Sequence, residues 1–240
     1  MREPELELKL KLKLESPQVK ICGLMLPETA KQMQEAGADV DYIGFVFAPS
    51  KRRIDAARAK EIAQAFGGGT APVPRFVGVF VNPEPEELDA IVKAVPLDAV
   101  QLHGDETAEY CREVKRRHPR VEVWKALGVS GDSLHGETAA ADRLGPYEGA
   151  VDTVLLDAWD PKTIGGTGTT FRWEAIPAYQ YWCDSNGVRL IVAGGLNSGN
   201  VGDLLDAYAV GAVDVSSGVE TDGVKDIEKI RTFTERVKGR

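Results

Sequence analysis

Eight strand-like segments that alternate with helix-like segments at intervals of roughly 30 residues predict a single (β/α)8 TIM barrel of parallel strands. Polar residues and glycines close several of these strands, and in such barrels the active site lies at the C-terminal face of the strands. The length of 240 residues and the apolar fraction of 43% suit one large α/β domain. We therefore expect one catalytic barrel over residues 17–240.

The predicted strands are short and rich in Val, Ile and Phe, and most precede Gly, Pro, Ser or Asn. They are Val19–Cys22, Tyr42–Phe47, Phe76–Val81, Ala99–His103, Val121–Lys125, Thr153–Asp157, Leu190–Ala193 and Val213–Ser216.

The clearer helices mix Ala, Leu, Glu, Lys and Ile at helical spacing, and several begin near Pro or Asp. They are Pro27–Ala36, Ala56–Phe66, Pro85–Ala94, Thr107–Arg117, Asn200–Val210 and Lys225–Val237. Two further segments, Ser133–Leu144 and Trp173–Cys183, contain Gly136 and Pro177, so only the barrel topology predicts them as helices.

Residues 1–16 form a separate N-terminal extension in this interpretation. Glu5–Leu14 alternates leucine with charged residues, which would place every leucine on one face of a strand. Two interpretations remain open, a frayed, disordered or artificial extension and an extra edge strand that pairs with a second subunit. The chain is accordingly expected to be a monomer or a homodimer.

Composition excludes several classes of protein. The net charge of −8 would repel nucleic acid and anionic membranes, so an anionic small-molecule substrate needs a local cationic site. The three cysteines, Cys22, Cys111 and Cys183, lie far apart without metal-ligand spacing, which argues against a disulfide scaffold and a zinc site. No apolar stretch approaches the roughly 20 residues of a membrane span, and the N-terminus lacks the apolar centre of a signal peptide. We expect a reduced, cytoplasmic protein.

Two proton-transfer groups close an early and a late strand. Cys22 ends the first strand and shares a face with Lys20, whose ammonium would favour the thiolate. Asp157 ends the sixth strand, with its carboxylate at the inner wall. A base and an acid that face each other across a barrel predict an isomerase. Cys22 as a packing residue and Asp157 as a helix cap or salt-bridge partner are the alternatives.

Further polar groups lie at other strand ends. Gln101 and His103 share a face of the fourth strand, where His103 is either a site residue or a structural histidine. The turns Ala193–Asn197 and Ser216–Glu220 follow the seventh and eighth strands, where barrels commonly bind phosphate through backbone N–H groups. Two such turns at these positions predict a phosphorylated substrate.

Six motifs together resemble the phosphoribosylanthranilate isomerase family, in the family's order and over nearly the whole chain from about Val19 onward. They are Lys20-Ile21-Cys22-Gly23-Leu24, Ser50-Lys51-Arg52-Arg53, Gln101-Leu102-His103-Gly104, Leu155-Leu156-Asp157, Ala193-Gly194-Gly195-Leu196-Asn197 and Asp214-Val215-Ser216-Ser217-Gly218-Val219-Glu220.

The resemblance implies an Amadori rearrangement of N-(5-phosphoribosyl)anthranilate to 1-(o-carboxyphenylamino)-1-deoxyribulose 5-phosphate in tryptophan biosynthesis, without metal or organic cofactor. It implies that Asp157 is the acid, Cys22 the base and Arg52 the group that contacts the anthranilate carboxylate. The other implied site residues are Gln101, His103, Asp214 and Ser216 around the substrate, Gly194, Gly195, Ser217 and Gly218 around the phosphate, and Gly165–Gly168 in a loop that closes over the substrate.

Three alternatives to this function stay open. A related phosphoribosyl isomerase of histidine biosynthesis would share the barrel and its phosphate turns, but that family resembles a two-aspartate design, whereas the first strand here ends in Cys22. A non-catalytic phosphate-binding barrel would keep the glycine turns without needing Cys22 or Asp157. A structural protein that assembles through the N-terminal leucines would explain none of the six motifs.

Overall fold

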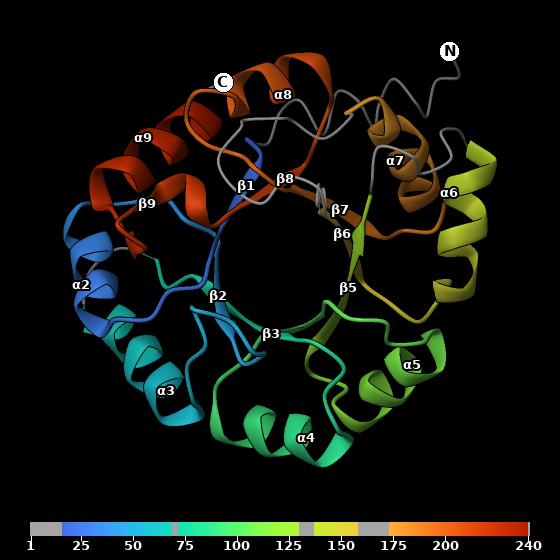
Figure 1. Cartoon of the computed structure of the whole chain (residues 1–240), viewed down its shortest axis with the longest axis horizontal. Coiled ribbons are helices and arrows are strands. Elements are labelled where there is room, and N and C mark those ends of the chain that lie inside the picture. Colours follow the sequence, from blue (N-terminus) through green and yellow to red (C-terminus); the bar gives the residue numbers. More distant parts are fainter. Residues whose placement is uncertain (1–15, 69–71, 130–136, 158–172, 240) are drawn as a thin grey trace.

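The computed structural model describes residues 16–68, 72–129, 137–157 and 173–239. Eight parallel strands close into one barrel in the order β1 to β8, and the helices surround it as an outer ring (Figure 1). The barrel strands are β1 (Gln18–Cys22), β2 (Tyr42–Val46), β3 (Arg75–Phe80), β4 (Ala99–Leu102), β5 (Glu122–Gly128), β6 (Thr153–Asp157), β7 (Arg189–Ala193) and β8 (Ala212–Val215). The predicted fold class and all eight predicted strands are therefore confirmed.

Helices are present in all eight predicted places, including the described parts of the two that only the topology indicated, but the last begins at Ile227 and not at Lys225, which lies in a strand. The helices are α2 (Pro27–Glu35), α3 (Ala56–Ala65), α4 (Pro85–Ala94), α5 (Ala108–Arg117), α6 (Glu137–Leu144), α7 (Ile176–Ser185), α8 (Val201–Ala207) and α9 (Ile227–Lys238). Pro177 lies in the first turn of α7, where its missing N–H has no intrahelical acceptor to lose, so it does not break the helix. Side chains of Asp55, Thr107 and Asp226 cap α3, α5 and α9.

The sequence prediction missed a small hairpin that follows β8. It pairs β9 (Glu220–Thr221) with β10 (Val224–Lys225) through the turn Asp222-Gly223. Both turn residues have positive φ, 52° and 80°, as a tight two-residue hairpin turn requires. An Asp-Gly pair is a recognised hairpin signal, but strands of two residues are too short to show alternation.

The barrel interior is a core of its own, separate from the larger core between strands and helices. Tyr42 and Trp124 pack edge to face inside it, with ring centroids 5.1 Å apart, and both are buried. Glu122 lies below them, accepts a hydrogen bond from the Trp124 indole and pairs with Arg75. Aromatic rings and an ion-pair layer thus close the N-terminal end of the barrel. The interior side chains are Tyr42, Val77, Ala99, Trp124, Ala126, Leu155, Ile191, Ala193 and Ala212.

A repeated aspartate joins odd and even strands at this closed end. Asp41, Asp98 and Asp152 each precede an even strand directly, and each accepts the first free backbone N–H of the preceding odd strand, from Val19, Phe76 and Val123 at 2.7, 2.7 and 2.9 Å. A carboxylate that accepts a strand N–H satisfies a donor that has no ladder partner at the rim. The three aspartates therefore fix the register of three strand pairs.

Asp98→Ala should lower the free energy of unfolding by about 1–3 kcal/mol, because it leaves the Phe76 N–H without its acceptor. Asp98 is the clearest test, since Asp41 and Asp152 also bind Lys238 and Lys115. Urea unfolding measures the effect, with the exposed Asp184→Ala as the control for loss of one carboxylate. Equal stability of the two variants would contradict the role of Asp98.

Two expectations fall outside the described residues. These are the N-terminal extension up to residue 15, with its leucine alternation, and the loop that contains Gly165–Gly168. Within the described ranges, no helix has both the length and the apolar character to cross a membrane.

Candidate active site

The predicted acid and base both project into the barrel from the C-terminal ends of their strands. Side chains two apart on a strand share a face, and Leu155 and Ala212 belong to the interior core. Asp157 and Asp214, each two residues further along β6 and β8, therefore face the interior at the mouth. Cys22 packs against Val46, Val79 and Ala48, which line the same end at β2 and β3.

The acid side is a chain of three side chains. His103 Nε2 lies 3.2 Å from Asp157 Oδ2, and Gln101 Nε2 lies 3.1 Å from His103 Nδ1. An amide nitrogen donates, so this arrangement makes Nδ1 the acceptor and leaves the ring proton on Nε2, the nitrogen that lies near the carboxylate. Gln101 is buried, whereas Asp157 and His103 are partly exposed. Gln101 thus orients His103, and His103 contacts Asp157.

Asp157 and His103 line a hollow of about 690 Å³ at the barrel mouth, which also includes Asn82, Asp105 and Arg143. Arg143 reaches it from α6 and donates to the Tyr179 hydroxyl and the Gly128 carbonyl. Within the described ranges, Asp157 Oδ1 has no hydrogen-bond partner. Among the described residues, His103 therefore contacts one carboxylate oxygen of Asp157, and no described group binds the other.

The base side contains Cys22, Lys20 and Asp214. Lys20 Nζ pairs with Asp214 Oδ2 at 3.1 Å, and the Lys20 side chain has no exposed surface. A Cβ on Gly44 would lie 2.9 Å from Cys22 Sγ and 3.2 Å from Lys20 Nζ, so the thiol and the ammonium meet at the space that this glycine leaves. Gly44 therefore lets both groups approach β2.

The expectation that Lys20 yields a thiol of lowered pKa is wrong in its net direction. Burial raises the pKa of the Cys22 thiol above its ordinary value, and this outweighs the opposing effect of the Lys20 ammonium. Asp214 adds to the rise, because its carboxylate opposes a second negative charge. The sequence placed the ammonium correctly but did not show the carboxylate that shares it.

Arg52 lies over the turn that follows Cys22. A Cβ on Gly23, whose φ is +81°, would meet Arg52 Cδ at 2.4 Å, so only glycine allows this approach. The guanidinium donates through Nε and Nη2 to both Glu220 oxygens, at 2.6 and 2.8 Å. This bidentate pair leaves the Nη1/Nη2 edge of Arg52 for another carboxylate.

Glu220 connects Arg52 to Lys225, a residue for which the sequence indicated no function. Lys225 is buried on β10 and contacts Glu220 Oε1 at 2.6 Å, the Ser216 carbonyl at 3.0 Å and the Ser216 hydroxyl at 3.2 Å. Ser216 in turn donates to the Cys22 carbonyl at 2.9 Å. The hairpin after β8 therefore fixes both Arg52 and the end of β1.

The ion pairs of Glu220 predict an acid-resistant loop. Burial alone would raise the pKa of Glu220, but hydrogen bonds from Arg52 and Lys225 outweigh it and hold the pKa at about 2, below the ordinary 4.5. Because the folded pKa is depressed, the stabilisation is full above pH 4.5 and is lost as the pH falls through about 2. Urea unfolding should therefore show a destabilisation by Glu220→Gln that is constant above pH 4.5 and shrinks below it. A destabilisation independent of pH across this window would contradict the ion-pair origin.

The two predicted phosphate turns touch each other. Gly194 and Gly195, after β7, have φ values of 92° and 63°. A Cβ on Gly218, in the 3-10 turn Ser217–Val219 after β8, would lie 1.9 Å from the Leu196 carbonyl oxygen. Glycine at position 218 thus lets the loops after β7 and β8 pack backbone to backbone.

Sequence reasoning also missed a buried pair beneath His103. Lys125 Nζ contacts Glu106 Oε2 at 3.1 Å and the Gly104 carbonyl at 2.7 Å, while Glu106 accepts the Gly104 and Asn82 N–H groups. The pair holds the loop that carries His103. A lysine inside the predicted fifth strand was the available signal, because a buried lysine needs a carboxylate partner.

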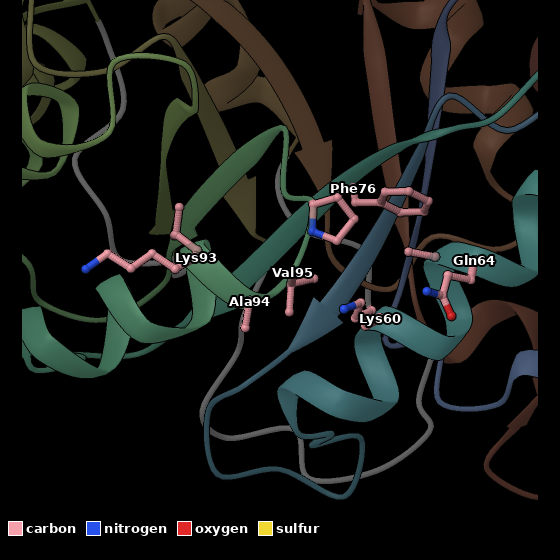
Figure 2. A pocket seen from close by; sticks show the side chains of 9 residues that line it. Lys60, Gln64, Phe76, Lys93, Ala94 and Val95 are labelled. Carbon is pink, nitrogen blue, oxygen red and sulfur yellow. The ribbon is translucent and has the colours of Figure 1, made fainter.

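A second hollow, of about 480 Å³, lies outside the barrel between α3 and α4. Lys60 and Gln64 line it from α3 and Phe76 from the start of β3, and Lys93 lines it from α4 with its ammonium end extended away from these three (Figure 2). It lies toward the N-terminal ends of the strands and contains no predicted site residue. The reaction chemistry is expected at the other end. Among the described side chains, no group of three or more His, Cys, Asp or Glu is arranged to hold a metal ion.

Comparisons with known proteins agree with this geometry. Residues 19–236 match the sequence model of the family described as N-(5'phosphoribosyl)anthranilate (PRA) isomerase. An N-(5'-phosphoribosyl)anthranilate isomerase of Brevibacillus brevis is 48% identical over 220 residues, which are 92% of this chain and 93% of the relative.

Two solved structures, each 37% identical, cover 93% of this chain and all of their own. One, with a TM-score of 0.73, shows monomers generated from the dimeric phosphoribosylanthranilate isomerase of Thermotoga maritima. The other, with a TM-score of 0.72, is a phosphoribosyl anthranilate isomerase in complex with reduced 1-(o-carboxyphenylamino)-1-deoxyribulose 5-phosphate.

Proposed function

Because this chain belongs to the N-(5'-phosphoribosyl)anthranilate isomerase family, we propose that it carries out the family's reaction with Asp157 as general acid and Cys22 as general base. The chain is an isomerase of tryptophan biosynthesis, and its reaction is the Amadori rearrangement of N-(5-phosphoribosyl)anthranilate. The observation that carries the residue assignment is the inward projection of Asp157 and Cys22 at the same end of the barrel.

The reaction needs two proton transfers on one sugar. A proton on the ribose ring oxygen opens the ring to a Schiff base, and removal of the C2 proton then gives an enolamine that tautomerises to the ketose. Asp157 Oδ1 is proposed to donate the proton in the first step. The His103 N–H, which contacts Oδ2, then stabilises the carboxylate that remains. Cys22, as thiolate, accepts the C2 proton in the second step.

Arg52 is proposed to bind the anthranilate carboxylate through the guanidinium edge that Glu220 leaves open. Arg52→Ala should raise KM by about 10- to 100-fold, as the loss of charge-assisted hydrogen bonds implies, with a smaller effect on kcat. Steady-state kinetics measure this effect, with the neighbouring exposed Arg53→Ala as the control. An unchanged KM in Arg52→Ala would remove the carboxylate contact.

The phosphate is proposed to bind between the turns after β7 and β8, on backbone N–H groups of Gly194, Gly195, Ser217 and Gly218. Direct contact between the two turns supports this placement, because both can then reach one anion. Asp214, Ser216, Gln101 and His103 complete the proposed substrate site. Ser216 and Gln101 already serve neighbouring groups, so we expect them to act by orienting Cys22 and His103.

Fluorescence of the anthranilate group gives the decisive assay. Purified protein should convert phosphoribosylanthranilate and leave the corresponding histidine-pathway substrate unchanged. Conversion of the histidine-pathway substrate alone would overturn the proposal, and conversion of both would show dual specificity. The proposed setting is the cytoplasm. The proposed assembly is a monomer or a homodimer, and the molar mass in solution, measured by light scattering, distinguishes the two.

A further inference from the structure

The ion pair between Lys20 and Asp214 lies in a place where it contributes little to stability. The two residues are direct neighbours on β1 and β8, with Nζ and Oδ2 3.1 Å apart. Lys20 has no exposed side-chain surface and Asp214 only 10%. Replacement of such buried ion pairs by apolar residues is often neutral or stabilising, because desolvation offsets their attraction. A buried pair beside a proposed base therefore points to function.

The Lys20 ammonium has donor capacity that Asp214 does not use. An ammonium carries three N–H donors, and among the described residues its charged partner is Asp214. Both Lys20 Nζ and Asp214 Oδ1 are buried from solvent, so water does not screen the charge. Cys22 Sγ meets the ammonium at the space left by Gly44. In this low-dielectric position the charge acts on the sulfur at close range.

Two other cations face Cys22, but each of them is paired with a carboxylate. Lys225 on β10 and Arg52 after β2 both interact with Cys22, but both bind Glu220. Lys20 is the cation with the largest effect on the thiol. Burial would lower the pKa of Lys20 itself, but Asp214 and Cys22 outweigh it, so the pKa is raised and the ammonium persists.

We propose that Lys20 is a positioning residue for the base, with its ammonium, kept protonated by Asp214, orienting the Cys22 sulfur and stabilising its thiolate. Asp214 has a second, opposite effect, because its carboxylate repels the thiolate that Lys20 attracts. The thiol proton leaves to solvent, and the thiolate then takes the C2 proton of the sugar. This inference rests on the proposed role of Cys22, and it adds two residues that set how readily Cys22 ionises.

The pH dependence of Cys22 alkylation by iodoacetamide tests the proposal without any substrate. Peptide mass spectrometry follows Cys22 separately from Cys111 and Cys183, whose pKa values burial raises to about 11 and about 12. Lys20→Met keeps the length of the side chain and removes its charge. We expect alkylation at pH 8 to slow by about tenfold or more, as a rise of one pKa unit implies. The acidic limb of kcat/KM should move to higher pH in parallel.

A second variant separates the two members of the pair. Lys20→Met leaves Asp214 unpaired, whereas Lys20→Met/Asp214→Asn removes both charges. The apparent thiol pKa should therefore be lowest in the wild type, intermediate in the double variant and highest in Lys20→Met. Lys125→Met is the matched control, because Lys125 is equally buried and paired with Glu106 but lies on β5, across the barrel from β1. Its Cys22 profile should match that of the wild type.

A Cys22 profile in either folded Lys20 variant that superimposes on the wild type would overturn the proposal. If neither variant folds, nitrogen NMR of the wild type decides. The Lys20 ammonium signal should shift as Cys22 is titrated, and a signal that ignores this titration overturns the proposal equally. Alkylation does not depend on turnover. Absence of isomerase activity in the wild type would instead refute the proposed function and leave the alkylation result standing.

Discussion

Asp157→Asn is expected to lower kcat by about 10²–10⁴-fold while leaving the fold intact, because it removes the proton donor for ring opening. The amide has nearly the same size and still offers an oxygen to the His103 N–H, so the contact at 3.2 Å has a substitute. An amide does not release a proton near neutral pH. The loss should therefore appear in kcat more than in KM.

Asp105→Asn is the matched control for this experiment. Asp105 lines the same hollow as Asp157, but its side chain is exposed, and the backbone N–H at this position contacts Asn82. The control removes one negative charge from the hollow and no proposed reacting group. Stopped or continuous fluorescence assays measure both variants, and circular dichroism verifies the fold. Near-normal turnover in Asp157→Asn would assign the acid to another residue.

Cys22→Ser is expected to cause a loss of similar size, about 10²–10⁴-fold in kcat, because a serine hydroxyl does not ionise in the working pH range. The pKa of the Cys22 thiol is raised by burial. Thiolate increases with pH, so wild-type activity should rise toward the alkaline side along a thiol-like limb. The serine variant should lack this limb.

Cys183→Ala provides the control for Cys22→Ser. Cys183 is fully buried in α7, outside the barrel interior, and its loss removes a thiol without touching the mouth. Its pH profile should resemble that of the wild type. A serine variant that retained both its turnover and the acidic limb of its pH profile would show that the limb and the base belong to another group.

The sequence predicts the barrel well because its signals are local. Runs such as Thr153–Asp157 are apolar and short, and the helix starts carry Pro, Asp or Thr, so strand and helix segments could be located without any tertiary contact. Face sharing within strands also depends only on the period of two. It placed Asp157, Gln101 and His103 on the inner wall correctly.

The parts that the sequence did not predict depend on residues that are distant along the chain. Arg52 and Glu220 are separated by 168 positions, and neither strand pattern nor composition indicates that they pair. The same holds for Asp214, which shares the Lys20 charge and helps to reverse the expected direction of the Cys22 pKa. Charge partners across a closed sheet follow from register and tilt, which a single sequence does not encode in any short window.

The Tyr42–Trp124 pair has a consequence for the entry of substrate and the release of product. Because aromatic rings close the N-terminal end of the barrel, the described residues leave the C-terminal face of the strands as the route to the interior. Substrate must enter, and ketose must depart, by the same route. Ketose that accumulates will therefore compete with substrate for the same site, and net turnover will depend on how quickly a following enzyme consumes the ketose.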